Sequence, residues 1–284
     1  MSRIAYVNGR YVPHADASVH IEDRGYQFAD GVYEVVAVTR GRLVDELPHL
    51  DRLDRSLREL RIAAPMSRAA LRTVLREVVR RNRVTNGIVY LQVTRGAAPR
   101  DHAFPKGGQL PALVVTARCQ APKRSQQDDG VAVITVPDIR WKRCDIKSVS
   151  LLPNVLAKQN AVEAGAYEAW QIAADGCITE GSATNAWIVS GDRALVTRPA
   201  DESILDGITR RTVIDIAARN GYRLEERGFT LEEAKRAAEC FLTSTTSWVM
   251  PVTSIDGDKI SGGTPGPLSR ALLSHYADYV DSLA

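Results

Sequence analysis

Alternating apolar and β-branched residues predict strands in the first part of the chain. Two short apolar runs, residues 4–7 and 10–12, flank Asn8-Gly9, which is the strongest short-range signal for a β-hairpin. Residues 31–38 form a longer run rich in valine, and the turn residues Arg40-Gly41 end it. The chain is therefore expected to begin with antiparallel strands.

Leucines at helical spacing predict a helix over residues 47–60, with arginine and aspartate between them. Ser67 is a typical N-cap, and it predicts a second helix that runs to about residue 81. Two β-branched runs, residues 87–94 and 112–117, predict strands on either side of a long polar loop. This order of elements indicates a domain of mixed α and β structure.

The second half also mixes strands with helices. Pro153 fits the first turn of a helix and Gly165 fits its end. The other predicted elements are strands at 131–136, 167–173, 186–189, 194–197 and 240–243, and helices at 210–220 and 267–283. The polar segment 120–130 reads as a linker, so we expect an α+β protein with an N-terminal α/β domain (1–119) and a C-terminal domain (131–284).

Composition restricts the classes of function. The 284 residues carry a net charge of +3 spread along the chain, which gives no electrostatic footprint for nucleic acid or an anionic membrane. We find no apolar run long enough for a membrane span or a signal peptide. The four cysteines are scattered and the five histidines lack ligand spacing, so we expect reduced thiols, a cytoplasmic protein and no bound metal.

Lysine is scarce, with seven in the chain, because arginine supplies most of the positive charge. An amine can lose its proton and condense with a carbonyl, whereas a guanidinium stays charged. Lys147 follows the predicted strand 131–136 and precedes the apolar pair Leu151-Leu152, so it could reach an interior site. Taken alone, this stretch fits an exposed loop lysine better.

Three features of the second half suggest one ligand. Gly207-Ile208-Thr209 stands at a predicted helix start, where backbone N–H groups and a hydroxyl can cradle a phosphate. The hydroxyls of Ser244-Thr245-Thr246 could bind the same anion, and Glu180 could pair with a basic nitrogen. Each alone is more typical of capping, turn or surface chemistry. Together with a nucleophilic lysine they match pyridoxal phosphate, with its phosphate, ring nitrogen and aldehyde.

Several separated motifs resemble the fold-type IV pyridoxal-phosphate enzymes, and among them the bacterial D-amino acid transaminases. The resemblance extends over nearly the whole chain. The matching stretches are residues 22–34, 49–53, 93–96, 99–102, 145–148, 153–158, 179–182 with Asn185, 207–210 and 243–247. The resemblance implies a smaller N-terminal α/β domain and a larger C-terminal domain that is β-barrel-like.

The resemblance also implies roles for single residues. Lys147 would form the Schiff base (aldimine) with pyridoxal 5'-phosphate and move the substrate proton. Glu180 would pair with the pyridine nitrogen, and Arg52 would bind the phosphate. The remaining phosphate contacts are implied for Ile208, Thr209, Ser244 and Thr245.

Substrate choice would rest on Tyr33, Arg100 and His102. In D-amino acid transaminases these positions form a trap for the α-carboxylate, and the arginine and histidine enter it from the partner subunit. An arginine suits this role because its planar charge pairs with a carboxylate through two hydrogen bonds. The resemblance therefore implies a homodimer that exchanges amino groups between D-amino acids (D-alanine, D-glutamate) and 2-oxo acids (2-oxoglutarate, pyruvate).

Two departures from the family pattern bear on side-chain preference. Trp248 and Met250 stand where the pattern usually has an acidic residue and a threonine, and Ala183-Thr184 replaces two serines. Two alternatives share the fold, a branched-chain L-amino acid transaminase and an aminodeoxychorismate lyase, and neither is expected to have the Arg100-x-His102 pair. A third is a non-enzymatic α+β binding protein in which Lys147 is idle.

Overall fold

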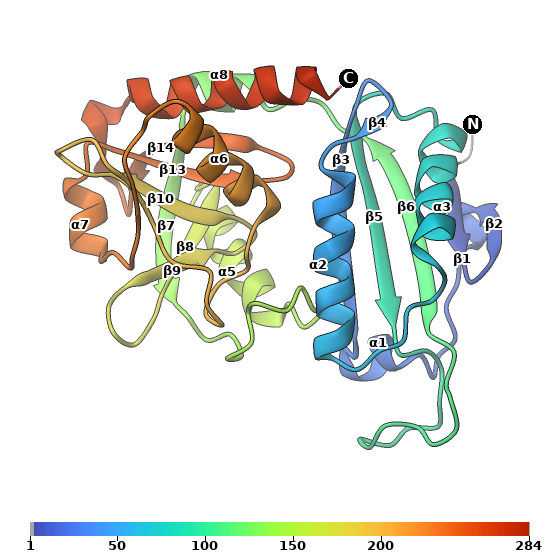
Figure 1. The fold of residues 1–284 in the computed structure, drawn as a ribbon. Helices are drawn as coiled ribbons and strands as arrows, with labels where there is room; N and C mark the ends of the chain where they lie inside the picture. Colours follow the sequence, from blue (N-terminus) through green and yellow to red (C-terminus); the bar gives the residue numbers. More distant parts are fainter. Residues whose placement is uncertain (1–2, 284) are drawn as a thin grey trace. The chain divides into compact units, whose positions relative to one another are not determined.

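The chain forms two compact units in the computed structural model, which describes residues 3–283 (Figure 1). The first unit holds residues 3–121 together with Ile146–Ser150. The second holds Pro122–Asp145 together with Leu151–Leu283. Each unit has a sheet and a hydrophobic core of its own.

The first unit is built on an antiparallel six-stranded sheet with the order β2-β1-β6-β5-β3-β4. Its strands are β1 (Ile4–Val7), β2 (Arg10–Pro13), β3 (Gly31–Thr39), β4 (Arg42–Leu43), β5 (Gly87–Thr94) and β6 (Ala112–Cys119). Its helices are α1 (Arg24–Phe28), α2 (Glu46–Glu59) and α3 (Arg68–Arg81), with the 3-10 turn η1 (His14–Asp16). The predicted hairpin is confirmed, and Asn8 and Gly9 have the positive φ of 45° and 93° that its turn requires.

The two long helices of this unit pack on the sheet through their apolar stripes. In α2 the leucines Leu50, Leu53 and Leu57 are buried at the predicted helical spacing, and the helix packs on β3. The predicted N-cap Ser67 accepts the Ala70 amide, and α3 packs on β6. Burying a leucine stabilises the fold by about 1.5–3 kcal/mol. This packing fixes the polar residues of α2 relative to β3.

A short segment far along the chain belongs to the first unit. Ile146–Ser150 runs beside the start of β3, where Ser148 forms an isolated antiparallel bridge with Val32. The Tyr33 amide donates to the Lys147 carbonyl at 3.0 Å. Backbone pairing, rather than side-chain packing alone, therefore sets Lys147 next to Tyr33.

The second unit is built on a nine-stranded sheet with the order β12-β11-β10-β13-β14-β7-β8-β9, and β15 pairs with β14. Its strands are β7 (Val131–Pro137), β8 (Glu168–Ile172), β9 (Ile178–Gly181), β10 (Asn185–Val189), β11 (Leu195–Thr197), β12 (Leu224–Glu226), β13 (Glu239–Ser244), β14 (Trp248–Ile255) and β15 (Asp258–Lys259). Its helices are α4 (Arg124–Asp129), α5 (Leu152–Glu163), α6 (Ile208–Arg219), α7 (Leu231–Arg236) and α8 (Pro267–Ser282), with the 3-10 turn η2 (Ser261–Gly263).

This second sheet curls into a half-barrel. β9 and β10 stand apart in the strand order, yet residues 182–184 alone join them and the two strands are in contact. So short a connection brings the far edge of the sheet back towards β10. Trp170 and Phe229 pack edge to face in the core, with ring centroids 6.4 Å apart.

The polar segment 120–130 contains the helix α4, which buries no side chain. Gln127 Nε2 of this helix donates to the Ser247 carbonyl at 3.0 Å, which attaches α4 to the turn between β13 and β14. Within residues 3–283, no helix is both long enough and apolar enough to cross a membrane.

Candidate active site

The predicted site residues divide equally between the two units. Those of the first unit are Tyr33, Arg52, Arg100, His102 and Lys147. Those of the second unit are Glu180, Ile208, Thr209, Ser244 and Thr245. Each unit thus holds five of the ten predicted site residues.

Lys147 is half-buried and lies against an aromatic ring. Its Nζ is 4.3 Å from the centroid of the Tyr33 ring, and its backbone N–H donates to Ser56 Oγ of α2 at 3.3 Å. Among residues 3–283, no carboxylate forms an ion pair with this amine. An amine that is not engaged in an ion pair is available to bond to a carbonyl carbon, so this position suits a nucleophile.

Arg52 is buried in a cluster with Glu34 and His49, and the three residues are 5%, 0% and 2% exposed. Arg52 Nε and Nη2 donate to the two carboxylate oxygens of Glu34, each at 2.8 Å. His49 Nδ1 lies 2.8 Å from Glu34 Oε2. A two-point pair of this kind fixes the plane of the guanidinium as well as its position.

The charges of this cluster follow from burial and proximity. Burial alone would raise the pKa of Glu34, but Arg52 and then His49 lower it to about 2. Burial lowers the pKa of His49, and the opposing effect of Glu34 is smaller. The imidazole is therefore neutral at neutral pH and donates its Nδ1 proton to the carboxylate. The cluster holds one cation and one anion.

Arg100 and His102 lie on the exposed loop between β5 and β6. The Arg100 Cζ is 5.0 Å from the centroid of the Phe28 ring, and the His102 ring centroid is 5.3 Å from that of the same ring. In the described part of the chain, no carboxylate forms an ion pair with Arg100. Its charge is therefore available to an incoming anion.

In the second unit, Glu180 of β9 is 6% exposed and accepts hydrogen bonds from three donor groups. Arg140 Nη1 donates to Oε1, and Asn185 Nδ2 donates to Oε2 at 3.0 Å. The Leu205 N–H points between the two oxygens, at 3.1 and 3.2 Å. Donors around a buried carboxylate stabilise its charged form.

Arg140 is itself held in place. Its Nη2 donates to Asp138 Oδ2 at 2.7 Å and to the Ser203 carbonyl at 3.0 Å. Burial alone would lower the pKa of Arg140, but Asp138 and Glu180 raise it above its usual range. Burial raises the pKa of the neighbouring Cys144 thiol to about 12, so this cysteine is not a nucleophile.

The start of α6 lies beside the same carboxylate. Asn185 Nδ2 also donates to the Leu205 carbonyl at 2.8 Å. Its Oδ1 approaches Gly207 so closely that an added Cβ would come within 2.1 Å of it. Gly207 is the N-cap and no side chain caps the helix, so the first amides, those of Ile208 and Thr209, lack an intrahelical acceptor. They form a natural anion site.

Ser244 and Thr245 follow at the end of β13. Strand register pairs Thr243 with Asn185, and α6 packs on β13, so these hydroxyls come at the same end of the half-barrel. Ser244 Oγ lies 2.6 Å from Ser247 Oγ and accepts the Ser247 N–H at 3.2 Å, which closes the turn into β14.

The residues that depart from the family pattern have different surroundings. The Trp248 ring lies 5.6 Å from that of Tyr276 on α8, and Trp248 has a positive φ of 55°. Met250 is fully buried in the core of the second unit. Thr184 Oγ1 is buried and finds no hydrogen-bond partner among the described residues.

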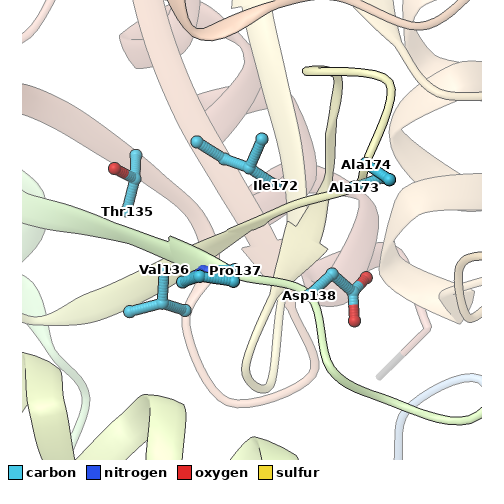
Figure 2. Close-up of a pocket in the computed structure, with 7 residues that line it drawn as sticks. All are labelled: Thr135, Val136, Pro137, Asp138, Ile172, Ala173 and Ala174. Atoms are coloured by element: carbon cyan, nitrogen blue, oxygen red, sulfur yellow. The ribbon is translucent and has the colours of Figure 1, made fainter.

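A hollow of about 450 Å³ opens beside β7 and β8 (Figure 2). Its lining residues are Thr135, Val136, Pro137, Asp138, Ile172, Ala173 and Ala174. Asp138, which also pairs with Arg140, connects it to the Glu180 network. None of the ten predicted site residues lines it, so the hollow adjoins that network without being the predicted site.

Comparisons with known proteins bear on the identity of this chain. The family described as amino-transferase class IV matches residues 31–255. The chain belongs to the class IV aminotransferases. The D-alanine aminotransferase of Bacillus licheniformis is 45% identical over 263 residues, 93% of this chain and 92% of that protein. The D-alanine aminotransferase of Listeria innocua is 41% identical over 281 residues, 96% of this chain and 95% of that protein.

A solved structure confirms the predicted fold-type IV architecture. The branched-chain amino acid aminotransferase of Escherichia coli superposes with a TM-score of 0.90 and covers 98% of this chain and 94% of its own. Its sequence is 22% identical, so the likeness shows the fold alone.

Class IV aminotransferases use pyridoxal phosphate, and each unit, taken by itself, holds groups of the kinds that this cofactor requires. The first unit supplies the amine of Lys147 and the buried guanidinium of Arg52. The second supplies the Glu180 carboxylate and, next to it, the uncapped amides of Ile208 and Thr209. A nucleophilic amine, a partner for the ring nitrogen and phosphate donors are the parts that the cofactor requires.

The sequence did not reveal four residues that bind Arg52 and Glu180 or lie next to them, namely Glu34, His49, Arg140 and Asn185. Glu34, His49 and Asn185 lie inside the matching stretches, but no role was assigned to them. Arg140 lies outside every matching stretch. Its one sequence signal is an arginine between two large apolar residues just after a predicted strand.

Proposed function

We propose that this class IV aminotransferase transfers amino groups between D-amino acids and 2-oxo acids, with D-alanine, D-glutamate, pyruvate and 2-oxoglutarate as substrates. The observation that carries the proposal is the exposed pair of Arg100 and His102 on one loop, both against the Phe28 ring. Two relatives that align with more than nine-tenths of the chain are D-alanine aminotransferases, which supports this substrate class.

The residues of the two units would bind pyridoxal 5'-phosphate in defined roles. Lys147 would bond to it covalently, and Glu180 would pair with its ring nitrogen. The phosphate would be bound by Arg52, Ile208, Thr209, Ser244 and Thr245. When bound, the cofactor supplies an electron sink for negative charge on the substrate Cα. The Lys147 amine, which lies against Tyr33, would remove and return the Cα proton.

The substrate carboxylate would be held by Tyr33, Arg100 and His102. A guanidinium binds a carboxylate through two parallel hydrogen bonds, which fixes the orientation of the substrate. Holding the carboxylate on one side decides which enantiomer presents its Cα–H to Lys147. A branched-chain L-amino acid transaminase or an aminodeoxychorismate lyase would not need this pair.

We propose a homodimer in which Arg100 and His102 serve the site of the partner subunit. Helix α5 supports this assembly, because Leu152, Val155, Leu156 and Val162 are 77%, 58%, 57% and 59% exposed. Several large apolar side chains exposed on one helix are typical of a protein–protein contact. Light scattering should give twice the 31.1 kDa mass of the chain, and Leu156→Glu should shift the mass towards the monomer.

Single-turnover spectroscopy tests the substrate class. The purified enzyme is mixed with one amino donor and no acceptor, and conversion of the cofactor to its amine form is followed by absorbance. D-alanine should convert it, and L-leucine and L-alanine should not. Conversion by L-leucine but not by D-alanine would contradict the proposal and favour the branched-chain alternative.

Lys147→Ala separates the enzyme from a binding protein with an idle lysine. The wild type should be yellow, and the variant should lose the bound chromophore band and amino transfer. A wild-type protein whose spectrum is unchanged by added pyridoxal phosphate would instead support the non-enzymatic alternative.

A further inference from the structure

The ring of Phe28, the last residue of α1, touches both members of the proposed carboxylate-binding pair. The Arg100 Cζ lies 5.0 Å from its centroid, and the His102 ring centroid lies 5.3 Å away at an interplanar angle of 52°. A third cation, Arg24 of the same helix, places its Cζ 4.8 Å from this ring. One aromatic side chain therefore borders the whole pair.

Arg24 fixes the backbone of the same loop. It is 3% exposed, and its Nη1 and Nη2 donate to the carbonyl oxygens of Asp101 and His102. Its Nε donates to Asp30 Oδ2 at 2.8 Å. The guanidinium thus joins the half-buried carboxylate of Asp30 on one side to two consecutive peptide groups on the other.

Asp30 accepts hydrogen bonds from two arginines, Arg24 and Arg95. Besides Arg24, it accepts hydrogen bonds from Arg95 Nε at 2.7 Å and Arg95 Nη2 at 2.9 Å. Arg95 also donates to the Leu60 and Arg61 carbonyls, at 2.7 and 2.8 Å. Burial alone would raise the pKa of Asp30, but hydrogen bonds from Arg95 and Arg24 lower it.

The backbone of this loop is anchored, whereas two of its side chains are exposed. The Asp101 and His102 carbonyls are tied to a 3%-exposed guanidinium, whereas the side chains of Arg100 and His102 are exposed. A solvated arginine samples many rotamers, and ordering it costs free energy when a ligand binds. An aromatic ring that limits those rotamers before the ligand binds would reduce the conformational entropy lost on binding.

We propose that Arg24 and Phe28 are positioning residues for the carboxylate-binding pair, with Arg24 setting the loop backbone and Phe28 setting the direction of the Arg100 and His102 side chains. This inference rests on the proposed function. Amino acid and 2-oxo acid substrates share the α-carboxylate, so loss of positioning should weaken both. It should leave the bound cofactor and the proton transfer by Lys147 unchanged.

Phe28→Leu and Phe28→Tyr form a matched pair for the test. Phe28→Leu removes the aromatic face and should raise KM for D-alanine and for 2-oxoglutarate by about three- to tenfold, the range of an exposed to partly desolvated cation–π contact. Its kcat and its bound-cofactor spectrum should match the wild type. Phe28→Tyr keeps the face and should restore KM. Equal KM values in the wild type and Phe28→Leu would refute the role of the ring.

Arg24→Lys keeps the positive charge beside Asp30 but cannot bridge two carbonyls and a carboxylate with one ammonium group. It should raise KM with little change in kcat. It should also speed amide hydrogen exchange in residues 101–104 of the intact holoenzyme, because the loop backbone loses its anchor. Unchanged exchange and unchanged KM together would refute the role of Arg24.

A double-mutant cycle separates positioning from general damage. If Phe28 acts through Arg100 and His102, then Phe28→Leu in an Arg100→Ala, His102→Ala background should change KM by less than twofold, because both side chains that it orients are gone. A purely structural effect would multiply instead and would also lower the thermal midpoint. If Arg100→Ala itself leaves KM unchanged, the proposed function fails; if it raises KM while Phe28→Leu does not, the positioning inference alone fails.

Discussion

Arg52 and Arg100 are both proposed to bind an anion, yet the structure holds them in opposite ways. Arg52 is 5% exposed and paired at two points with Glu34, whereas Arg100 is exposed and stacked on an aromatic ring. A carboxylate partner holds a guanidinium in one fixed orientation, so the buried Arg52 suits a phosphate that stays bound. An aromatic contact leaves the guanidinium of Arg100 exposed, so Arg100 suits a carboxylate that is exchanged in every half-reaction.

Removing Arg52 should have the largest effect. Arg52→Leu leaves Glu34 buried without its cation, which costs about 3–5 kcal/mol of unfolding free energy. The variant should also lose pyridoxal phosphate on dialysis. Denaturant unfolding and bound-cofactor absorbance measure the two effects.

The double variant Glu34→Gln with Arg52→Leu is the control for this prediction. It removes both charges, so it should recover much of the stability while cofactor retention stays poor. Full cofactor retention in the double variant would show that Arg52 serves the fold and not the phosphate.

The acid limb of stability should depend on Glu34. Its folded-state pKa of about 2 lies below the ordinary value of 4.5, so its contribution is complete above about pH 4.5 and is lost as the pH falls towards 2. That shift corresponds to roughly 3 kcal/mol. Glu34→Gln should flatten this part of the curve, measured by denaturant unfolding from pH 5 to pH 2 with excess cofactor. The same slope in both proteins would contradict the prediction.

The exposed arginine should affect substrates without affecting the fold. Arg100→Ala should lower kcat/KM for D-alanine roughly thirtyfold, a loss of about 2 kcal/mol of binding free energy, because a charge-assisted pair with the carboxylate is lost. The change should come from a higher KM and not from a lower kcat. The free energy of unfolding should stay within about 0.5 kcal/mol of the wild type, as for most surface changes. Arg100→Lys keeps the charge but loses the two-point geometry and should fall between. A loss of cofactor from Arg100→Ala would erase the contrast with Arg52.

The sequence predicts the elements well where a single period or a turn decides them. The Asn8-Gly9 hairpin and the leucine stripe of α2 are confirmed, because local backbone geometry and the burial of one face are enough to specify them. The same patterns could not show that Ile146–Ser150 pairs with the start of β3, because a bridge between residues more than 100 positions apart leaves no local signal.

For the site, motifs identify chemical groups better than their partners. The matching stretches singled out Arg52 and Glu180, yet the side chains that bind them, Glu34 and Arg140, are known only from the packing. Arg140 follows the end of β7 and donates to Glu180 of β9, which is 40 residues further along the chain. A helical or strand period cannot encode that contact.

The smallest expected effect comes from a hydroxyl of the second unit, where the resident anion would meet several neutral donors at once. Thr245→Val replaces that hydroxyl with a methyl group of similar shape, so it tests one hydrogen bond without opening a cavity. The amides of Ile208 and Thr209 remain in the variant, so cofactor affinity should weaken by about 1 kcal/mol, roughly fivefold. Thr246→Val, one residue further along the turn, is the matched control and should change affinity less. A loss as large as that of Arg52→Leu would mean that the phosphate depends on the turn rather than on the buried arginine.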